Sequence, residues 1–326
     1  MKYPTFIKKN STIGICAPSA GVGRKIQDFD NSLKVLKTEG YQIYETPSVR
    51  VNDVRSADAK TRAKELHSLF NNKKIDMVMC AAGGDFLFEM LPEVNWNTLV
   101  KHPKWMMGAS DPTSLLFTYT TKYDVATLYG CNAGSYANIP FHDCFKDNLE
   151  LLKGNLVSQI SFTHINSSAP FSDEPSVYDL KSSWNSTHKT LHVSGRCIGG
   201  CMDVLKDLIG TEYDHVSNFI KKYHKDGFIW YFDNFALSAE TFYNTLLQMK
   251  YAGWFKYTKA IIIGRTIFPS ENIITYDEAI LKALNGIPVL SNADVGHTLP
   301  HMTMINGAIL DLTYKRKKAT LKFSLK

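Results

Sequence analysis

Short runs of apolar residues alternate with amphipathic segments through the first 150 residues, and this alternation constrains the possible folds strongly. The apolar runs lie at residues 11–18, 76–82, 105–107 and 125–129, and a shorter alternating run lies at 41–46. Helices are predicted between them at 28–40, 57–70 and 85–91. Strands that are apolar throughout are usually buried on both faces. The pattern therefore predicts an α/β domain in which helices cover both faces of a parallel sheet.

The second half of the chain has a different texture. Residues 158–194 are polar and rich in Ser, Thr, Asn and Pro, which favours a linker followed by a surface insertion. A glycine-rich turn leading into a helix is expected at 195–210. The remaining pattern predicts strands at 228–232, 259–264, 288–290, 308–312 and 319–323, and helices at 238–253 and 276–284. We expect two domains, 1–160 and 161–326, the second being mixed α/β.

Composition is that of a globular protein that can bury a sizeable core. Among 326 residues, 44% are hydrophobic and 21% charged, and the net charge of +6 is spread along the chain. The densest basic cluster, 315–318, is interpreted as a turn between two strands, so no nucleic-acid partner is expected. No apolar run is long enough for a signal peptide or a membrane span, which predicts a cytoplasmic protein.

The cysteines point to buried free thiols and not to a metal site. The six are scattered and lie mostly in apolar runs: Cys16, Cys80, Cys131, Cys144, Cys197 and Cys201. Cys197 and Cys201 are four residues apart, but no histidine or second cysteine pair stands at the spacing of a zinc site. No metal site is therefore expected.

The stretch 104–119, KWMMGASDPTSLLFTY, is the main candidate for chemistry. It predicts a strand, a sharp turn bearing Ser110, and a helix that begins near Pro112. Such a turn exposes a hydroxyl beside the N-terminus of the helix, where a nucleophile can act. The alternative is an N-capping serine. The stretch alone favours the cap, because it lacks the second glycine of the G-x-S-x-G motif.

Two glycines and two polar residues could complete such a site. Gly83-Gly84 closes a predicted strand, and its backbone N–H groups could form an oxyanion hole with that of Asp111. Phosphate binding and a plain tight turn are the alternatives. His297 follows a strand end and a glycine, which favours it over its nearest rival, His301, as a base. Asp233 ends the strand at 228–232 and could orient the imidazole, or could be a solvated turn residue.

Several segments together resemble the serine LD-carboxypeptidase family, peptidase family S66, which includes microcin C immunity proteins of the MccF type. Residues 104–113 resemble its K-x-x-x-G-x-S-D-x-T segment, and 195–213 resemble its G-x-x-x-G-G-x-x-x-x-L block, which continues to G-T-x-Y. Further similarities lie at 13–19, 63–69, 76–84, 91–92, 129–130, 264–265 and 296–298. The resemblance covers almost the whole chain.

The resemblance implies a role for each candidate residue. Ser110 would be the nucleophile, His297 the general base, and the N–H groups of Gly84 and Asp111 the oxyanion hole. The third member of the family's triad is a glutamate, and the matching residue here is Asp233, which is one methylene shorter. The implied fold is a Rossmann/flavodoxin-like N-terminal domain, similar to class I glutamine amidotransferases, followed by a mixed α/β domain. A homodimer is also implied. The acyl transfer that such a triad performs needs no metal and no organic cofactor, so none is expected.

Two substrate classes follow from the resemblance. LD-carboxypeptidases cleave the amide between an L-centre and a D-amino acid in murein tetrapeptides during cytoplasmic peptidoglycan recycling, whereas MccF-type members cleave peptidyl or aminoacyl adenylates. We expect Gly83 and Trp184 to bind substrate, Trp184 as an aromatic residue of the insertion. The shorter acid leaves open a catalytically weakened homologue that only binds. An α/β-hydrolase-type esterase is disfavoured, because G-x-S-x-G and an HGGG-like loop are both missing.

Overall fold

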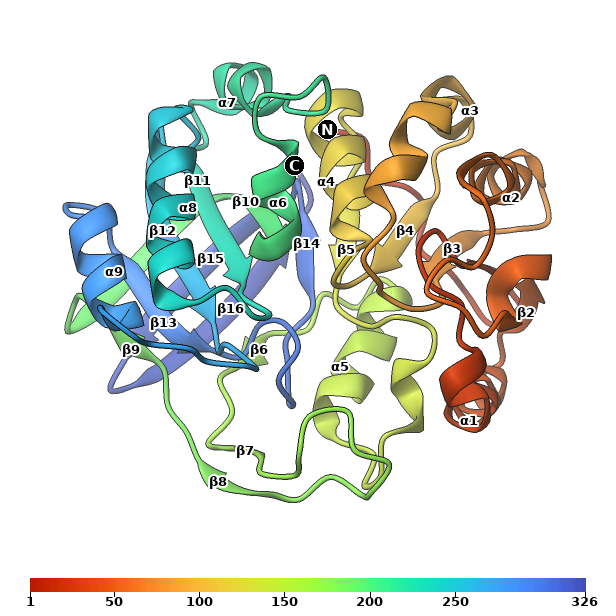
Figure 1. Ribbon diagram of the computed structural model, residues 1–326, viewed down its shortest axis with the longest axis horizontal. Coiled ribbons are helices and arrows are strands. Elements are labelled where there is room, and N and C mark those ends of the chain that lie inside the picture. Colours follow the sequence, from red (N-terminus) through yellow and green to blue (C-terminus); the bar gives the residue numbers. More distant parts are fainter. The chain divides into compact units, whose positions relative to one another are not determined.

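The computed structural model describes residues 1–326, which fold into two compact units, Met1–Asn155 and Leu156–Lys326. Each unit has its own sheet and buried core (Figure 1). The boundary lies five residues before the expected start of the second domain at residue 161. These residues belong to the second unit because β6 (Gln159–Ile160) pairs with its strand β16 (Lys318–Ser324).

The first unit is built on parallel strands in the order β2-β1-β3-β4-β5. Their bounds are β1 Thr12–Cys16, β2 Gln42–Glu45, β3 Met77–Cys80, β4 Trp105–Gly108 and β5 Thr127–Tyr129. Every residue of β3 and β4 is buried, as the apolar runs predict. The parallel sheet expected from the sequence is confirmed.

Helices cover both faces of these strands. The bounds are α1 Ile26–Thr38, α2 Ala59–Asn71, α3 Trp96–Lys101, α4 Thr113–Tyr123 and α5 Asp143–Leu152. Short 3₁₀ helices are η1 Gly23–Lys25, η2 Pro47–Arg50, η3 Phe88–Glu93 and η4 Ser135–Ala137. Figure 1 shows α2, α3 and α4 on one side of the sheet and α1 and α5 on the other. The helix expected at 85–91 is instead the 3₁₀ helix η3, which continues past Pro92.

The strand order places a topological switch between β1 and β3. The chain leaves β1 toward β2 at one edge, whereas β3 lies on the other side of β1. Ligands of such sheets bind beyond the carboxyl ends of the strands near this point. Ser19, Gly84 and Ser110 follow the ends of β1, β3 and β4 respectively.

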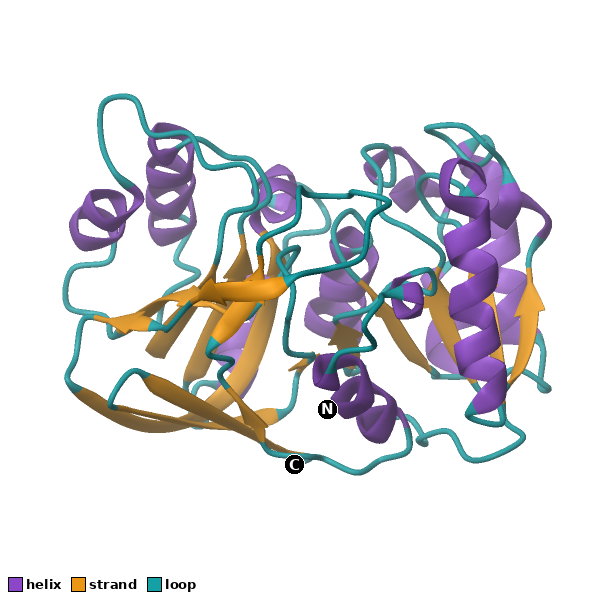
Figure 2. Ribbon diagram, turned by 90° about the horizontal axis from the view of Figure 1, so that it is seen from below, coloured by secondary structure: helices purple, strands orange, loops and turns teal.

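The second unit contains a larger mixed sheet in the order β6-β16-β15-β10-β11-β12-β13-β9. The remaining bounds are β9 Asn185–Ser186, β10 Thr190–Cys201, β11 Phe228–Asp233, β12 Thr258–Gly264, β13 Val289–Ala293 and β15 Ile309–Lys315. Strands β10 to β13 are parallel, and the outer strands are antiparallel. Figure 2 shows that the sheet is strongly curved. β14 (Met304–Asn306) and the hairpin β7 (His164–Asn166) and β8 (Tyr178–Lys181) complete the strands of this unit.

Four helices accompany this sheet: α6 Met202–Leu208, α7 Val216–Tyr223, α8 Ala239–Tyr251 and α9 Tyr276–Ala283. A glycine-rich turn leading into a helix was expected at 195–210. The turn is wrong, since residues 195–201 form the end of β10, but the helix is present as α6. A Cβ on Gly199 would overlap the carbonyl oxygen of Tyr231 on the adjacent strand, so glycine is needed for close strand packing. The basic cluster 315–318 is the turn between β15 and β16, as expected. None of the helices in the chain has the length and apolar character required to cross a membrane.

Candidate active site

Ser110 lies in a tight turn between β4 and α4. Its φ of +68° is in the left-handed region, which a non-glycine residue occupies only at an energetic cost. The end of β5 fixes this turn, because the Ser110 N–H donates to the hydroxyl of Tyr129 (3.2 Å) and the Ala109 N–H donates to Asn132 (3.0 Å). The N-cap of α4 is Pro112, and no side chain caps the helix. The capping interpretation of Ser110 is therefore wrong.

The two glycines after β3 pass directly beside this serine. A Cβ on Gly83 would lie 3.1 Å from Ser110 Oγ, and a Cβ on Gly84 would overlap Ser19 Oγ. Gly84 also has a φ of +145°, which disfavours any side chain there. Backbone amides can therefore approach a group held at the Ser110 hydroxyl more closely than side chains would allow.

The carboxylate of Asp111 fastens the surrounding loops. It is buried, and its Oδ2 accepts hydrogen bonds from the Ser19 hydroxyl and from the Leu87 N–H (2.8 Å). Burial raises the pKa of Asp111 to about 6, against the opposing effect of these two hydrogen bonds. Sequence reasoning considered only the main-chain N–H of this residue, because its two partners lie far away along the chain.

Replacing Asp111 by asparagine is expected to change how stability depends on pH. The raised pKa means that protonated Asp111 stabilises the fold below its usual pKa, near 3.8, and that this contribution is lost as pH rises through about 6. Asparagine does not titrate. The free energy of unfolding of Asp111→Asn relative to the parent should therefore increase by roughly 3 kcal/mol between pH 3 and 7. Urea unfolding across this range measures it, and a constant difference would contradict the expectation.

His297 and Asp233 form a close pair in the second unit. Nδ1 of His297 lies 2.7 Å from Oδ2 of Asp233, whose side chain is fully buried, and the His297 N–H donates to Oδ1 (3.3 Å). Gly296, with a φ of +105°, leaves room for this carboxylate, because a Cβ there would overlap Oδ1. The shorter acid therefore reaches the imidazole, and the interpretation of Asp233 as a solvated turn residue is wrong.

The surroundings of His297 favour its charged form. Burial alone would lower the pKa of His297, but the charge and hydrogen bonding of Asp233, together with the charge of Asp203, raise it overall. Asp203 also fixes the loop after β11 by accepting the N–H groups of Phe235 (2.9 Å) and Ala236 (3.0 Å). The rival His301 differs, because burial lowers its pKa to about 4.

Trp184 does not lie on an exposed loop. Its side chain is fully buried and donates from Nε1 to Oδ2 of Asp294 (2.7 Å), and Oδ1 of that carboxylate pairs with Arg265 (2.7 Å). In this structure Trp184 therefore offers no ring face to a ligand, contrary to the expectation of an exposed aromatic residue. The polar sequence around Trp184 gave no indication of its hydrogen-bond partner, Asp294, which lies 110 residues further along the chain.

A separate aromatic cluster adjoins His297. The ring of Phe235 lies 4.7 Å from the imidazole, centroid to centroid, and 5.3 Å from the ring of Phe268. Phe171, which is 61% exposed, lies 6.2 Å from both phenyl rings. The sequence patterns did not single out these residues, although Phe171 belongs to the predicted insertion.

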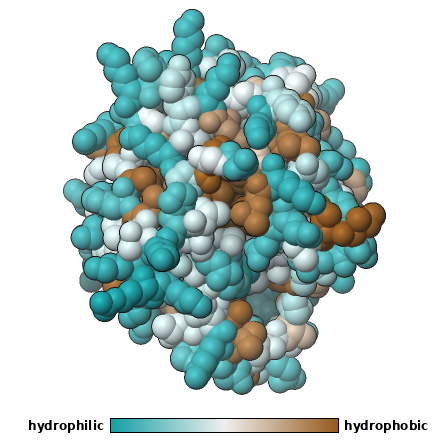
Figure 3. Space-filling model, turned by 90° about the vertical axis from the view of Figure 1, so that its left-hand side faces the viewer, coloured by the Kyte–Doolittle hydropathy of each residue, from teal (hydrophilic) through white to brown (hydrophobic).

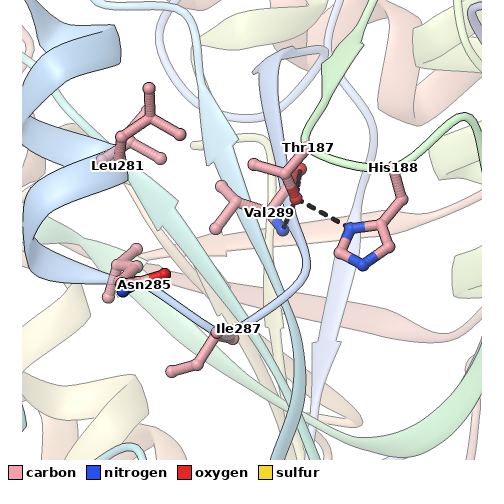
Figure 4. Close-up of a pocket in the computed structure, with 9 residues that line it drawn as sticks. Thr187, His188, Leu281, Asn285, Ile287 and Val289 are labelled. Atoms are coloured by element: carbon pink, nitrogen blue, oxygen red, sulfur yellow. Dashed lines mark hydrogen bonds between the residues drawn. The ribbon is translucent and has the colours of Figure 1, made fainter.

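A pocket of about 250 Å³ also lies in the second unit (Figure 4). α9 and the segments around β9 and β13 line it, and the Thr187 hydroxyl contacts both His188 Nδ1 (2.9 Å) and the Val289 N–H (3.0 Å). Figure 3 looks at the side of this unit that carries α9 and shows hydrophobic patches among hydrophilic side chains; Leu281 of α9 is 62% exposed. None of the predicted site residues lines this pocket.

Comparison with known proteins identifies the family. Residues 13–130 match the LD-carboxypeptidase N-terminal domain, and residues 194–312 match the LD-carboxypeptidase C-terminal domain. The chain belongs to the LD-carboxypeptidase family. The two matches contain Ser110 in the first domain and both Asp233 and His297 in the second, and they confirm the family resemblance found in the sequence.

Relatives of this LD-carboxypeptidase family member include a self-immunity protein and a carboxypeptidase. Microcin C7 self-immunity protein MccF of Escherichia coli is 26% identical over 95% of this chain and 92% of its own. A solved structure of MccF with aspartyl sulfamoyl adenosine has a TM-score of 0.84 at 22% identity and covers 99% of each chain. Muramoyltetrapeptide carboxypeptidase from Oxalobacter formigenes has a TM-score of 0.76 at 19% identity, covering 96% of this chain and 99% of its own. These structural likenesses establish the fold.

Proposed function

We propose that this chain is a serine LD-carboxypeptidase that hydrolyses the amide between an L-centre and a D-amino acid in murein tetrapeptides. The observation that carries the proposal is the 2.7 Å contact between His297 and the buried Asp233, since a paired, oriented imidazole is what a serine nucleophile needs. The strained turn at Ser110 supplies the candidate hydroxyl. The proposal requires that this hydroxyl meets Nε2 of His297 when substrate is bound.

In the proposed reaction, His297 takes the proton from Ser110 while the serine oxygen attacks the scissile carbonyl. The N–H groups of Gly84 and Asp111 stabilise the oxyanion that forms. The imidazolium returns the proton to the departing amine of the D-amino acid, which leaves an ester on Ser110. A water molecule, deprotonated by the same imidazole, then attacks the ester. The imidazolium returns this proton to the Ser110 oxygen as the ester bond breaks and the acid is released. Throughout, Asp233 holds Nδ1 so that Nε2 faces the hydroxyl.

An MccF-like hydrolase of peptidyl or aminoacyl adenylates is the second candidate. The cluster of Phe171, Phe235 and Phe268 favours it, because a partly exposed aromatic surface beside the imidazole suits a planar group better than it suits the small side chain of D-alanine. Trp184, the residue first expected in this role, is buried. Gly83 remains a proposed neighbour of the bound substrate in both cases.

Incubation with two substrates separates these candidates. The purified protein is given a murein tetrapeptide in one reaction and an aminoacyl adenylate analogue in another, and products are identified by mass. Release of D-alanine supports the carboxypeptidase, and release of the free amino acid from the analogue supports the MccF-like activity. Binding of either compound without any product would overturn both and leave a homologue that only binds.

We further propose that the protein acts as a cytoplasmic homodimer in peptidoglycan recycling. This rests on the family resemblance. Light scattering during size exclusion measures the oligomeric state, and cell fractionation measures the location. A monomer, or a protein recovered outside the cytoplasm, would contradict the corresponding part.

A further inference from the structure

Arg62 is a buried cation that the proposed reaction does not use. It lies on α2, and only 1% of its surface is exposed. Its Nη1 donates to the carbonyl oxygens of Pro18 (2.8 Å) and Phe86 (3.0 Å), and its Nη2 pairs with Glu89 at 2.5 Å. Removing a charge from water is costly, so a buried guanidinium needs several partners in fixed positions.

The two carbonyl acceptors belong to different loops. Pro18 follows β1, and Phe86 lies between β3 and η3. A guanidinium is planar and presents its donors in a rigid fork, so one side chain can hold two carbonyl groups at a fixed separation. Arg62 therefore fastens the loop after β1 to the loop after β3.

Gly83-Gly84 lies in the loop after β3 and packs against the loop after β1. The Ala20 N–H donates to the carbonyl oxygen of Gly83 (3.2 Å), and Gly84 packs so tightly against Ser19 that a side chain would not fit. The carboxylate of Asp111 accepts hydrogen bonds from the Ser19 hydroxyl, in the loop after β1, and from the Leu87 N–H, in the loop after β3. Arg62 and Asp111 thus hold the same pair of loops together. Arg62 donates to one main-chain carbonyl group in each loop, whereas the Asp111 carboxylate accepts a hydrogen bond from one donor in each loop.

We infer that Arg62 is a positioning residue for the oxyanion hole. By fixing the separation of the two loops, it sets the direction of the Gly84 N–H toward the position that the oxyanion occupies. This inference rests on the proposed function. An oxyanion exists only in the transition state and intermediates, so loosening the loops should slow the reaction without weakening the binding of substrate.

The test compares Arg62→Lys with a matched control, Arg196→Lys. Lysine keeps the charge but loses the planar fork. Arg196 is also buried, at 3% exposure, pairs with Asp226 at 2.6 Å and donates to the carbonyl of Gly307, but it lies on β10. The measurements are kcat, KM, thermal stability, and the affinity of a peptidyl boronic acid, which forms a tetrahedral adduct with a nucleophilic serine.

We expect kcat of Arg62→Lys to fall by roughly 10- to 100-fold with KM changed less than about twofold. The affinity for the boronic acid should fall by a similar factor, whereas the pH at which activity is half-maximal should not move. Arg196→Lys should lose comparable thermal stability and keep kcat. If Arg62→Lys does not fold, Arg62→Gln, which keeps a planar donor, is measured in the same way.

Two outcomes would overturn the inference. One is an unchanged kcat in the Arg62 variant, and the other is an equal loss of kcat in Arg196→Lys at equal loss of stability. Failure of the proposed function is distinguishable, because the parent protein would then neither turn over the substrates nor form an adduct with the boronic acid.

Discussion

Ser110→Ala should abolish turnover, with kcat falling on the order of 10⁵-fold or more. The substitution removes the proposed nucleophile, and the members of such a triad act as one unit. Substrate should still bind, because the methyl group of alanine occupies no more space than the hydroxymethyl group. Product formation by mass, together with binding of the substrate by calorimetry, measures the two effects separately.

Ser114→Ala is the matched control. Ser114 lies on α4, one turn beyond the proposed nucleophile, and its side chain is fully buried. Its loss removes a hydroxyl from the helix that follows Ser110 without changing the turn at Ser110, so full turnover is expected. A Ser110→Ala variant that keeps the activity of the parent would remove Ser110 from the mechanism.

Asp233→Asn should lower kcat by roughly 10³- to 10⁴-fold and move the pH dependence of activity to lower pH. An amide at this position favours the wrong tautomer of His297. The general base acts in its neutral form, so activity of the parent should rise as pH increases through a His297 pKa that lies above its usual value of 6.5. Removing the charge that raises this pKa lets the imidazole lose its proton at lower pH. Rates measured between pH 5 and 9 report the midpoint.

Asp294→Asn controls for the cost of changing a buried acid. Asp294 is fully buried in the same unit, and its carboxylate pairs with Arg265 and accepts from Trp184. Its replacement should lower stability but leave the midpoint of the pH profile in place. Equal shifts in both aspartate variants, or none in Asp233→Asn, would show that Asp233 does not tune His297.

Local patterns predicted the fold where each element carries its own signal. The wholly apolar strands β3 and β4 and the amphipathic helix α2 were expected within two residues of their observed ends. The end of β10 was misassigned as a turn because it contains Gly199. This glycine accommodates the backbone of Tyr231 on β11, which lies 32 residues further along the chain. A requirement imposed by a distant strand cannot be recognised from local sequence.

In the candidate site, too, some features follow from local sequence and others depend on distant segments. The closeness of Gly83 and Ser110 follows from parallel strands ending at one edge of a sheet, which the sequence pattern predicts. The contacts of Arg62 and of the Asp111 carboxylate were not predicted, since each joins segments 24 to 92 residues apart. Whether Ser110, Asp233 and His297 act together stays a prediction for the variants above.

The left-handed backbone of Ser110 has a consequence for how mutations at this position are selected. Glycine adopts a φ of +68° without strain, so Ser110→Gly should relax the turn and recover on the order of 1 kcal/mol, which Ser110→Ala does not. A homologue that does not need this hydroxyl could thus gain stability through this single substitution. The proposed role of the Ser110 hydroxyl would account for a serine at this strained position, because activity and stability then favour different residues.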